Sequence, residues 1–133
     1  MSTRCCTINS LPLSLDIFCR VIDNFGDAGV LWRLAREMRC EGFAVRLIID
    51  DVPTLALLAG KPRDTAPEAI ADDERLQVIH WDNSWNNGPC PLTVADMVVE
   101  GFACRLPPDY ENRIIAHKTV WVNIDYFTAE DWI

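Results

Sequence analysis

The part of the sequence that constrains the fold most begins with a nearly continuous apolar run from Leu15 to Ile22. Such a run is typical of a parallel strand covered on both faces. From Gly29 onward apolar residues recur at three- and four-residue steps, and Gly42 follows as a C-cap, so this pattern predicts an amphipathic helix. Residues 44–50 form a second apolar run. The order strand, helix, strand predicts two parallel strands joined by a right-handed crossover.

The remaining sequence continues the alternation of strands and helices. Proline marks the start of two further helices, one with Pro53 in its first turn and one beginning at Pro107 or Pro108. Residues 60–75 are a polar connection without a face for the core, and residues 82–92 have the Asn, Gly and Pro content of a loop. The further expected strands are 76–81, 95–102 and 119–124. Together these elements predict an α/β fold with a doubly wound, Rossmann-like parallel sheet.

Length, charge and the absence of long apolar runs narrow the class of protein. The 133 residues suit one domain, with residues 1–14 as a flexible tail and residues 15–133 as the folded part. A net charge of −8 argues against nucleic acid as a partner. The sequence has neither a signal-peptide pattern nor a run of about 18 apolar residues, so we expect a cytoplasmic protein that does not bind membranes.

The cysteines and histidines do not have the spacing of a metal site. There are six cysteines and two histidines, and no two cysteines form a C-x-x-C pair, so neither zinc nor a disulfide framework is predicted. Cys19 in the first strand and Cys104 beside Phe102 are expected to be small buried hydrophobic residues.

The last residues have the form of a helix start. In the tetrapeptide TAED, Thr128 is placed as an N-cap and Asp131 lies three residues later, as in a capping box. The chain stops two residues after this signal. We therefore expect the native polypeptide to continue, the alternative being a fortuitous tetrapeptide.

Two aspartates, Asp23 and Asp27, lie in the loop expected after the first strand, where open parallel sheets bind ligands. A dinucleotide fingerprint needs G-x-G-x-x-G, but only Gly26 and Gly29 are present, and Asp27 would repel a phosphate. Asp27 alone is readily explained as the cap of the following helix. Two carboxylates around a glycine turn instead suit a cationic or hydroxyl-bearing substrate.

Four separated blocks make the interpretation more specific. They read LDIFCRVIDNFGDAGVLWRLAREM, VRLIIDD, ADMVVEGFACRLPPDY and VWVNIDYFTAEDW. In this order they resemble the N-terminal half of the EarP family, the protein-arginine rhamnosyltransferases that modify translation elongation factor P. The resemblance runs from about Leu15 to the end of the chain, is weak over residues 61–75, and departs from the family pattern around Gly101 to Arg105.

The resemblance implies a GT-B glycosyltransferase with two Rossmann-like domains facing a cleft. The implied activity is transfer of rhamnose from TDP-β-L-rhamnose to an arginine of elongation factor P, with inversion at the anomeric carbon and without a metal. The nucleotide-sugar is held mainly by a C-terminal domain that this chain lacks. We therefore expect a fragment that forms the acceptor side of the enzyme and is inactive alone.

The D-N-x-G-D motif of the family matches this sequence residue by residue. The resemblance implies that Asp23 and Asp27 are the catalytic carboxylates. An arginine side chain has a pKa of about 12.5 or higher and is a poor nucleophile, so a carboxylate would orient it and accept a proton as the new bond forms. Asp27 is assigned as the base and Asp23 as the orienting partner. The expected substrate-binding residues are Asn24, Phe25, Gly26 and Gly29, Phe25 being either a pocket wall or part of the core.

Two other functions remain open from the sequence. One is a non-catalytic module that docks elongation factor P and turns over nothing, because the donor-binding domain is absent. The other is a different Rossmann-like enzyme that binds a nucleotide in the first loop, for which the glycine fingerprint is missing.

Overall fold

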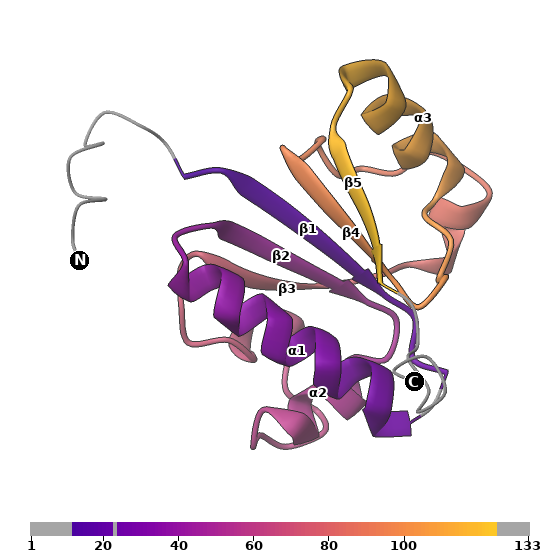
Figure 1. The fold of residues 1–133 in the computed structure, drawn as a ribbon. Coiled ribbons are helices and arrows are strands. Elements are labelled where there is room, and N and C mark those ends of the chain that lie inside the picture. Colours follow the sequence, from indigo (N-terminus) through magenta and orange to yellow (C-terminus); the bar gives the residue numbers. More distant parts are fainter. Residues whose placement is uncertain (1–11, 23, 125–133) are drawn as a thin grey trace, which may run out of the picture.

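Five parallel strands form a sheet in the order β3-β2-β1-β4-β5 (Figure 1). The structure is a computed structural model and describes residues 12–22 and 24–124. The strands are β1 (Ser14–Cys19), β2 (Ala44–Ile49), β3 (Leu76–His80), β4 (Met97–Gly101) and β5 (Val120–Ile124). This topology confirms the predicted doubly wound, Rossmann-like α/β fold.

Helices cover both faces of the sheet. On one face lie α1 (Asn24–Cys40) and α2 (Val52–Leu58), and on the other lies α3 (Pro108–His117) (Figure 1). The 3-10 helices η2 (Pro67–Ala69) and η3 (Asn83–Asn86) lie in the longer connections. Side chains of successive strand residues point to opposite faces, so Ile17 joins the core beneath α1 and α2, whereas Phe18 joins the core beneath α3.

The strand order reverses between β1 and β4. The connection after β1 therefore leads to the helix on one face, and the connection after β4 leads to the helix on the other. Such a reversal opens a crevice at the carboxyl ends of the two strands, which is where open α/β sheets bind ligands. We therefore expect a ligand site at this edge of the sheet.

The first helix begins earlier than its apolar pattern indicates. It starts at Asn24 and not at Gly29, so Phe25, Gly26 and Asp27 are helical and do not form a glycine turn. The prediction was wrong here because apolar periodicity marks only core-facing apolar residues, and the buried position of the first turn is occupied by the charged residue Asp27. The end of the helix was predicted correctly: Gly42 has a φ of 106°, and the N–H of Phe43 donates to the carbonyl of Met38 at 3.1 Å.

The polar connection before β3 contributes to the core, contrary to expectation. Ile70, which directly follows η2, is only 2% exposed and packs in the core beneath α1 and α2. A single apolar residue in a polar segment gives no periodicity from which to predict this. The expected capping box at Thr128 to Asp131 lies outside the described residues.

Candidate functional site

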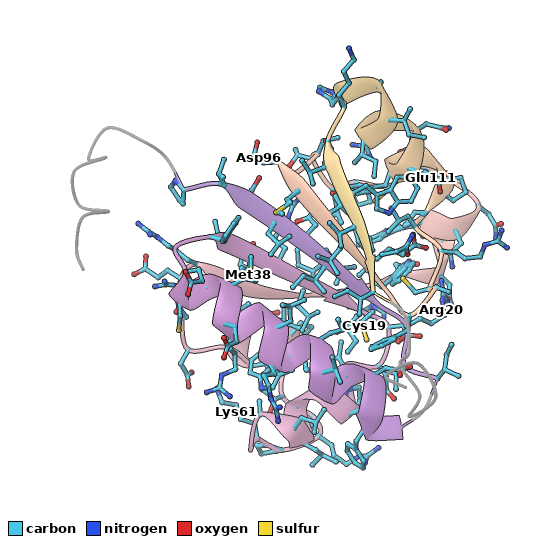
Figure 2. All side chains as sticks on the ribbon, viewed as in Figure 1. Cys19, Arg20, Met38, Lys61, Asp96 and Glu111 are labelled. Atoms are coloured by element: carbon cyan, nitrogen blue, oxygen red, sulfur yellow. The ribbon has the colours of Figure 1, made fainter. Side chains whose placement is uncertain are left out.

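Acidic side chains from three elements lie at the carboxyl edge of the sheet. Asp27 comes from the first turn of α1, Asp50 follows β2, and Glu100 lies near the end of β4. Figure 2 shows Cys19 and Arg20 at the same edge, at the end of β1. The sequence pointed only to the aspartates around α1.

Asp27 is buried and fixes the short connection before α1. The residue is 1% exposed, and its Oδ2 atom accepts a hydrogen bond of 3.3 Å from the backbone N–H of Ile22. A carboxylate in the first turn of a helix also meets the positive end of the helix dipole. Asp27 is therefore not the N-cap of α1, as the sequence suggested, but lies within its first turn and holds the connection before it at the expected edge.

Asp50 and Asp51 organise the neighbouring connection, and the sequence interpretation missed both. Asp50 accepts a 2.8 Å bond from the N–H of Val21, which ties the loop after β1 to the end of β2. Asp51 caps α2, accepting from the N–H of Thr54 at 3.1 Å and from its hydroxyl at 2.8 Å. The available signal was an aspartate pair placed directly after an apolar strand.

Cys19 lies among these negative charges. Burial raises the pKa of its thiol far above the usual value, and Cys104, Asp27 and Asp50 raise it further. A thiol in such surroundings stays protonated at neutral pH and is a poor nucleophile. Cys19 and Cys104 are both buried, which confirms the sequence prediction for these two residues.

The loop after β4 has an unusual backbone. Phe102, Ala103 and Arg105 have φ values of 52°, 56° and 65°, which side chains other than glycine rarely adopt. Glu100 holds the loop by accepting a 2.8 Å bond from the N–H of Arg105, and it accepts a 3.2 Å bond from Trp121 Nε1. Backbone strain of this kind is concentrated at functional sites.

Arg20 is held in place beside this loop. Its guanidinium lies 4.4 Å from the ring centroid of Trp81, and its Nε donates a 3.4 Å bond to the carbonyl of Cys104. Arg20 and Arg105 line a polar hollow of about 550 Å³ in the crevice between the β1 and β4 connections. The edge of the sheet therefore presents the carboxylates Asp27 and Asp50 near α1, and both arginines and the carboxylate Glu111 around the hollow next to α3.

The structure brings most of the predicted site residues onto one end of α1. Asn24 begins the helix, Phe25 is 51% exposed and therefore not part of the core, and Gly26 and Gly29 line a hollow of about 430 Å³ beside α2. A Cβ atom built on Gly29 would meet nothing within 4 Å. Asp23 lies outside the described residues.

The described residues offer neither a cluster suited to a metal ion nor a helix suited to span a membrane. In residues 12–22 and 24–124, no group of three or more His, Cys, Asp or Glu side chains is arranged to hold a metal ion. None of the helices described there has the length and apolarity needed to cross a bilayer.

Comparison with known proteins gives a consistent answer. Residues 15–133 match the family described as Elongation-Factor P (EF-P) rhamnosyltransferase EarP. Curated relatives named protein-arginine rhamnosyltransferase include one from Pseudomonas putida, 40% identical over 121 residues, and one from Pseudomonas aeruginosa, 39% identical over 123 residues. A relative of the same name from Neisseria meningitidis is 40% identical over 126 residues.

These relatives are much longer than the chain. The three alignments cover 89%, 90% and 93% of this chain but only 30% or 31% of each relative. The chain thus spans about a third of the length of the curated relatives it matches.

Proposed function

The chain belongs to the EarP family of elongation factor P rhamnosyltransferases, and we propose that it forms the acceptor-binding part of an enzyme that rhamnosylates one arginine of elongation factor P. The donor would be TDP-β-L-rhamnose, bound mainly by the part of the relatives that this chain does not span. The observation that supports this most is the family match together with Asp27, a carboxylate held at the start of α1 beside the carboxyl end of β1.

The proposed chemistry is an inverting displacement at the anomeric carbon, without a metal. A bond forms from a guanidinium nitrogen to this carbon, the bond to TDP breaks, and the nitrogen loses a proton to a carboxylate. Because the guanidinium is fully protonated at neutral pH and its lone pair is delocalised, the carboxylates must orient it and accept the proton as the bond forms. We assign the base role to Asp27 and the orienting role to Asp23.

The position of Asp27 requires the acceptor to compete with a backbone bond. The 3.3 Å bond from Ile22 is long. A guanidinium would donate shorter bonds of about 2.7–2.9 Å, in which both partners are charged. We therefore expect Ile22 to shift when the arginine arrives, because at 70% exposed it has little packing to resist this, whereas Arg20 and Val21 stay held by their own contacts.

The second candidate function is a docking module that binds elongation factor P without turnover. Nucleotide binding in the first loop has less support than either, because the chain passes from β1 to α1 in residues 20–23, without the three glycines of a phosphate loop.

Titration calorimetry with unmodified elongation factor P tests the proposal. We expect binding by the 133-residue chain to weaken about tenfold or more when the acceptor arginine is replaced by alanine, because a charged hydrogen-bonded pair is lost. Asp27→Ala and Asp23→Ala should have the same effect, whereas Asp64→Ala, in an exposed loop, should have none. Equal binding of both acceptor forms would show that the acceptor arginine does not bind at the start of α1.

Mass spectrometry of elongation factor P after incubation with TDP-β-L-rhamnose separates the two functions. The chain alone should bind and leave the acceptor unmodified. Addition of the relatives' remaining region should restore transfer if the chain is part of an enzyme, and should not if it is only a docking module.

A further inference from the structure

A groove follows α1 from the candidate site along the side that faces α2. One hollow of about 430 Å³ is lined by Gly26, Gly29 and Arg33, and a second of about 390 Å³ lies further along the helix. Trp32, Arg36 and Leu58 line both hollows, so the two form one continuous groove. The groove begins at Gly26, the residue that directly precedes Asp27 in α1.

The two arginines of this groove have no partner within the described part of the chain. Arg33 and Arg36 are both exposed and lie one helical turn apart. The other cations of the groove are paired: Arg39 Nε lies 2.8 Å from Asp73 Oδ1, and Lys61 Nζ lies 2.9 Å from Asp72 Oδ1. Within the described residues, Arg33 and Arg36 are therefore the cations of the groove whose charge is available to a partner.

Exposed apolar side chains lie in and near the first turns of α1, and one of them, Val30, lines the groove. Ile22, Phe25 and Val30 are 70%, 51% and 52% exposed. Two glycines on the same stretch, Gly26 and Gly29, leave the backbone of α1 accessible between them. Exposed apolar groups gathered beside charged groups are typical of protein-protein interaction surfaces.

We propose that the α1 groove docks an acidic segment of the acceptor protein, with apolar residues at the end nearest Asp27. This inference rests on the proposed function and extends it, because it gives the acceptor a second contact beyond its target arginine. The charge of Arg33 and Arg36 selects the occupant, since a basic or neutral segment would leave both guanidinium groups desolvated and unpaired. The continuity of the groove with the start of α1 places this segment beside the target arginine.

The charges of Arg33 and Arg36 also affect how the acceptor protein approaches α1. The target guanidinium is repelled by Arg33 and Arg36 when it nears the start of α1, unless acidic residues accompany it. An acidic segment attracted to the groove would raise the rate of association and orient the acceptor, and both effects weaken as salt screens the charges.

The test compares charge reversals at two places on the surface. The double variant Arg33→Glu/Arg36→Glu is titrated with unmodified elongation factor P at low and high salt, beside the control Arg63→Glu/Arg75→Glu, which changes net charge equally at exposed residues outside the groove. We expect the groove variant to bind about tenfold more weakly and to lose most of the salt dependence. Arg33→Lys/Arg36→Lys should retain most of the affinity, and circular dichroism should show all three variants to be folded.

Three results would overturn the inference in distinguishable ways. If the groove variant binds like the wild-type chain while Asp27→Ala weakens binding, the groove is not used and the proposed function stands. If both double variants weaken binding equally, the attraction is a general effect of net charge. If the folded wild-type chain does not bind, the proposed function fails and the groove proposal fails with it.

Amide chemical shifts give an independent readout. Addition of elongation factor P should move the signals of Gly29, Val30 and Arg33 and leave those of α3 unchanged. Shifts confined to α3 would place the contact on the opposite face of the sheet.

Discussion

Arg46 of β2 holds Asp16 of β1 through two parallel hydrogen bonds of 2.6 Å each, from Nε to Oδ1 and from Nη2 to Oδ2. The two residues are direct partners in the strand register. Asp16 is 0% exposed and also accepts a bond from Tyr110 Oη of α3. One buried carboxylate therefore links two central strands to the helix above them and fixes the register that positions the carboxyl edge.

We expect Arg46→Met to lower the free energy of unfolding by about 3–5 kcal/mol, because it leaves the buried Asp16 carboxylate without its cation. Urea denaturation measures this directly. The control Arg39→Met breaks the pair with Asp73, whose side chains are about a third exposed, and should cost about 1 kcal/mol or less. Equal losses for the two variants would show that Asp16 does not depend on Arg46.

Asp109 should contribute to acid sensitivity. Its Oδ2 accepts a 2.8 Å bond from the N–H of Cys90, which together with Arg113 lowers the pKa of the carboxyl below its ordinary 3.8. Because the folded-state pKa is the lower one, this stabilisation is present above the unfolded-state pKa and is lost as pH falls through the folded-state value. Asp109→Asn should flatten the decline of the urea midpoint below about pH 4. Asp64→Asn, in an exposed loop, is the control.

Ala103→Gly should stabilise the protein. Ala103 is exposed and has a φ of 56°, a conformation that costs a side-chain-bearing residue about 1–2 kcal/mol and glycine almost nothing. The greater freedom of glycine in the unfolded chain offsets about 0.4–1 kcal/mol of this gain. We therefore expect a net increase of about 0.5–1 kcal/mol in the free energy of unfolding. The control Ala116→Gly, at an exposed position of α3, should lower the free energy of unfolding by about 1 kcal/mol. If Ala103→Gly lowers it as well, the backbone at Ala103 is not strained.

The strands and the order of helices follow directly from the sequence, because apolar runs and three- to four-residue steps report which side chains face the core. The same signal cannot report contacts between segments that are distant in sequence. Asp16 and Arg46 are single charged residues in apolar runs, and only the pairing of β1 with β2 makes them partners. The bond from Val21 to Asp50 is hidden for the same reason.

Local backbone geometry at the candidate site was equally inaccessible. Gly26 and Gly29 suggested a turn, but both are helical, and the left-handed residues of the site edge are Phe102, Ala103 and Arg105, none of which is a glycine. Left-handed conformations at such residues are set by surrounding packing and by bonds such as that from the Arg105 N–H to Glu100. Residue type alone gave no reason to expect them.

Gly101 allows α1 to pack closely on β4. A Cβ atom at this position would lie 2.3 Å from Leu31 Cδ1 and 3.0 Å from the carbonyl oxygen of Phe18. Leu31 is 0% exposed, so its side chain could yield only by repacking within the core, and the backbone carbonyl of Phe18 cannot turn aside. Gly101→Ala should therefore lower the free energy of unfolding by about 1–3 kcal/mol, measured in urea. An unchanged midpoint would mean that α1 can shift away from the sheet without cost.

Gly29→Ala should raise the stability of the protein and weaken its binding of elongation factor P. Gly29 is in the interior of α1 and a Cβ atom there meets nothing within 4 Å, so alanine should raise the free energy of unfolding by up to about 1 kcal/mol through its higher helix propensity. The added methyl group enters the groove beside Arg33, where we propose that the acceptor protein lies against the helix. We expect elongation factor P to bind this more stable variant more weakly, and a bulkier Gly29→Leu to bind it more weakly still. Unaltered affinity in both variants, with the stability gain present in the first, would show that the acceptor does not approach the backbone of α1.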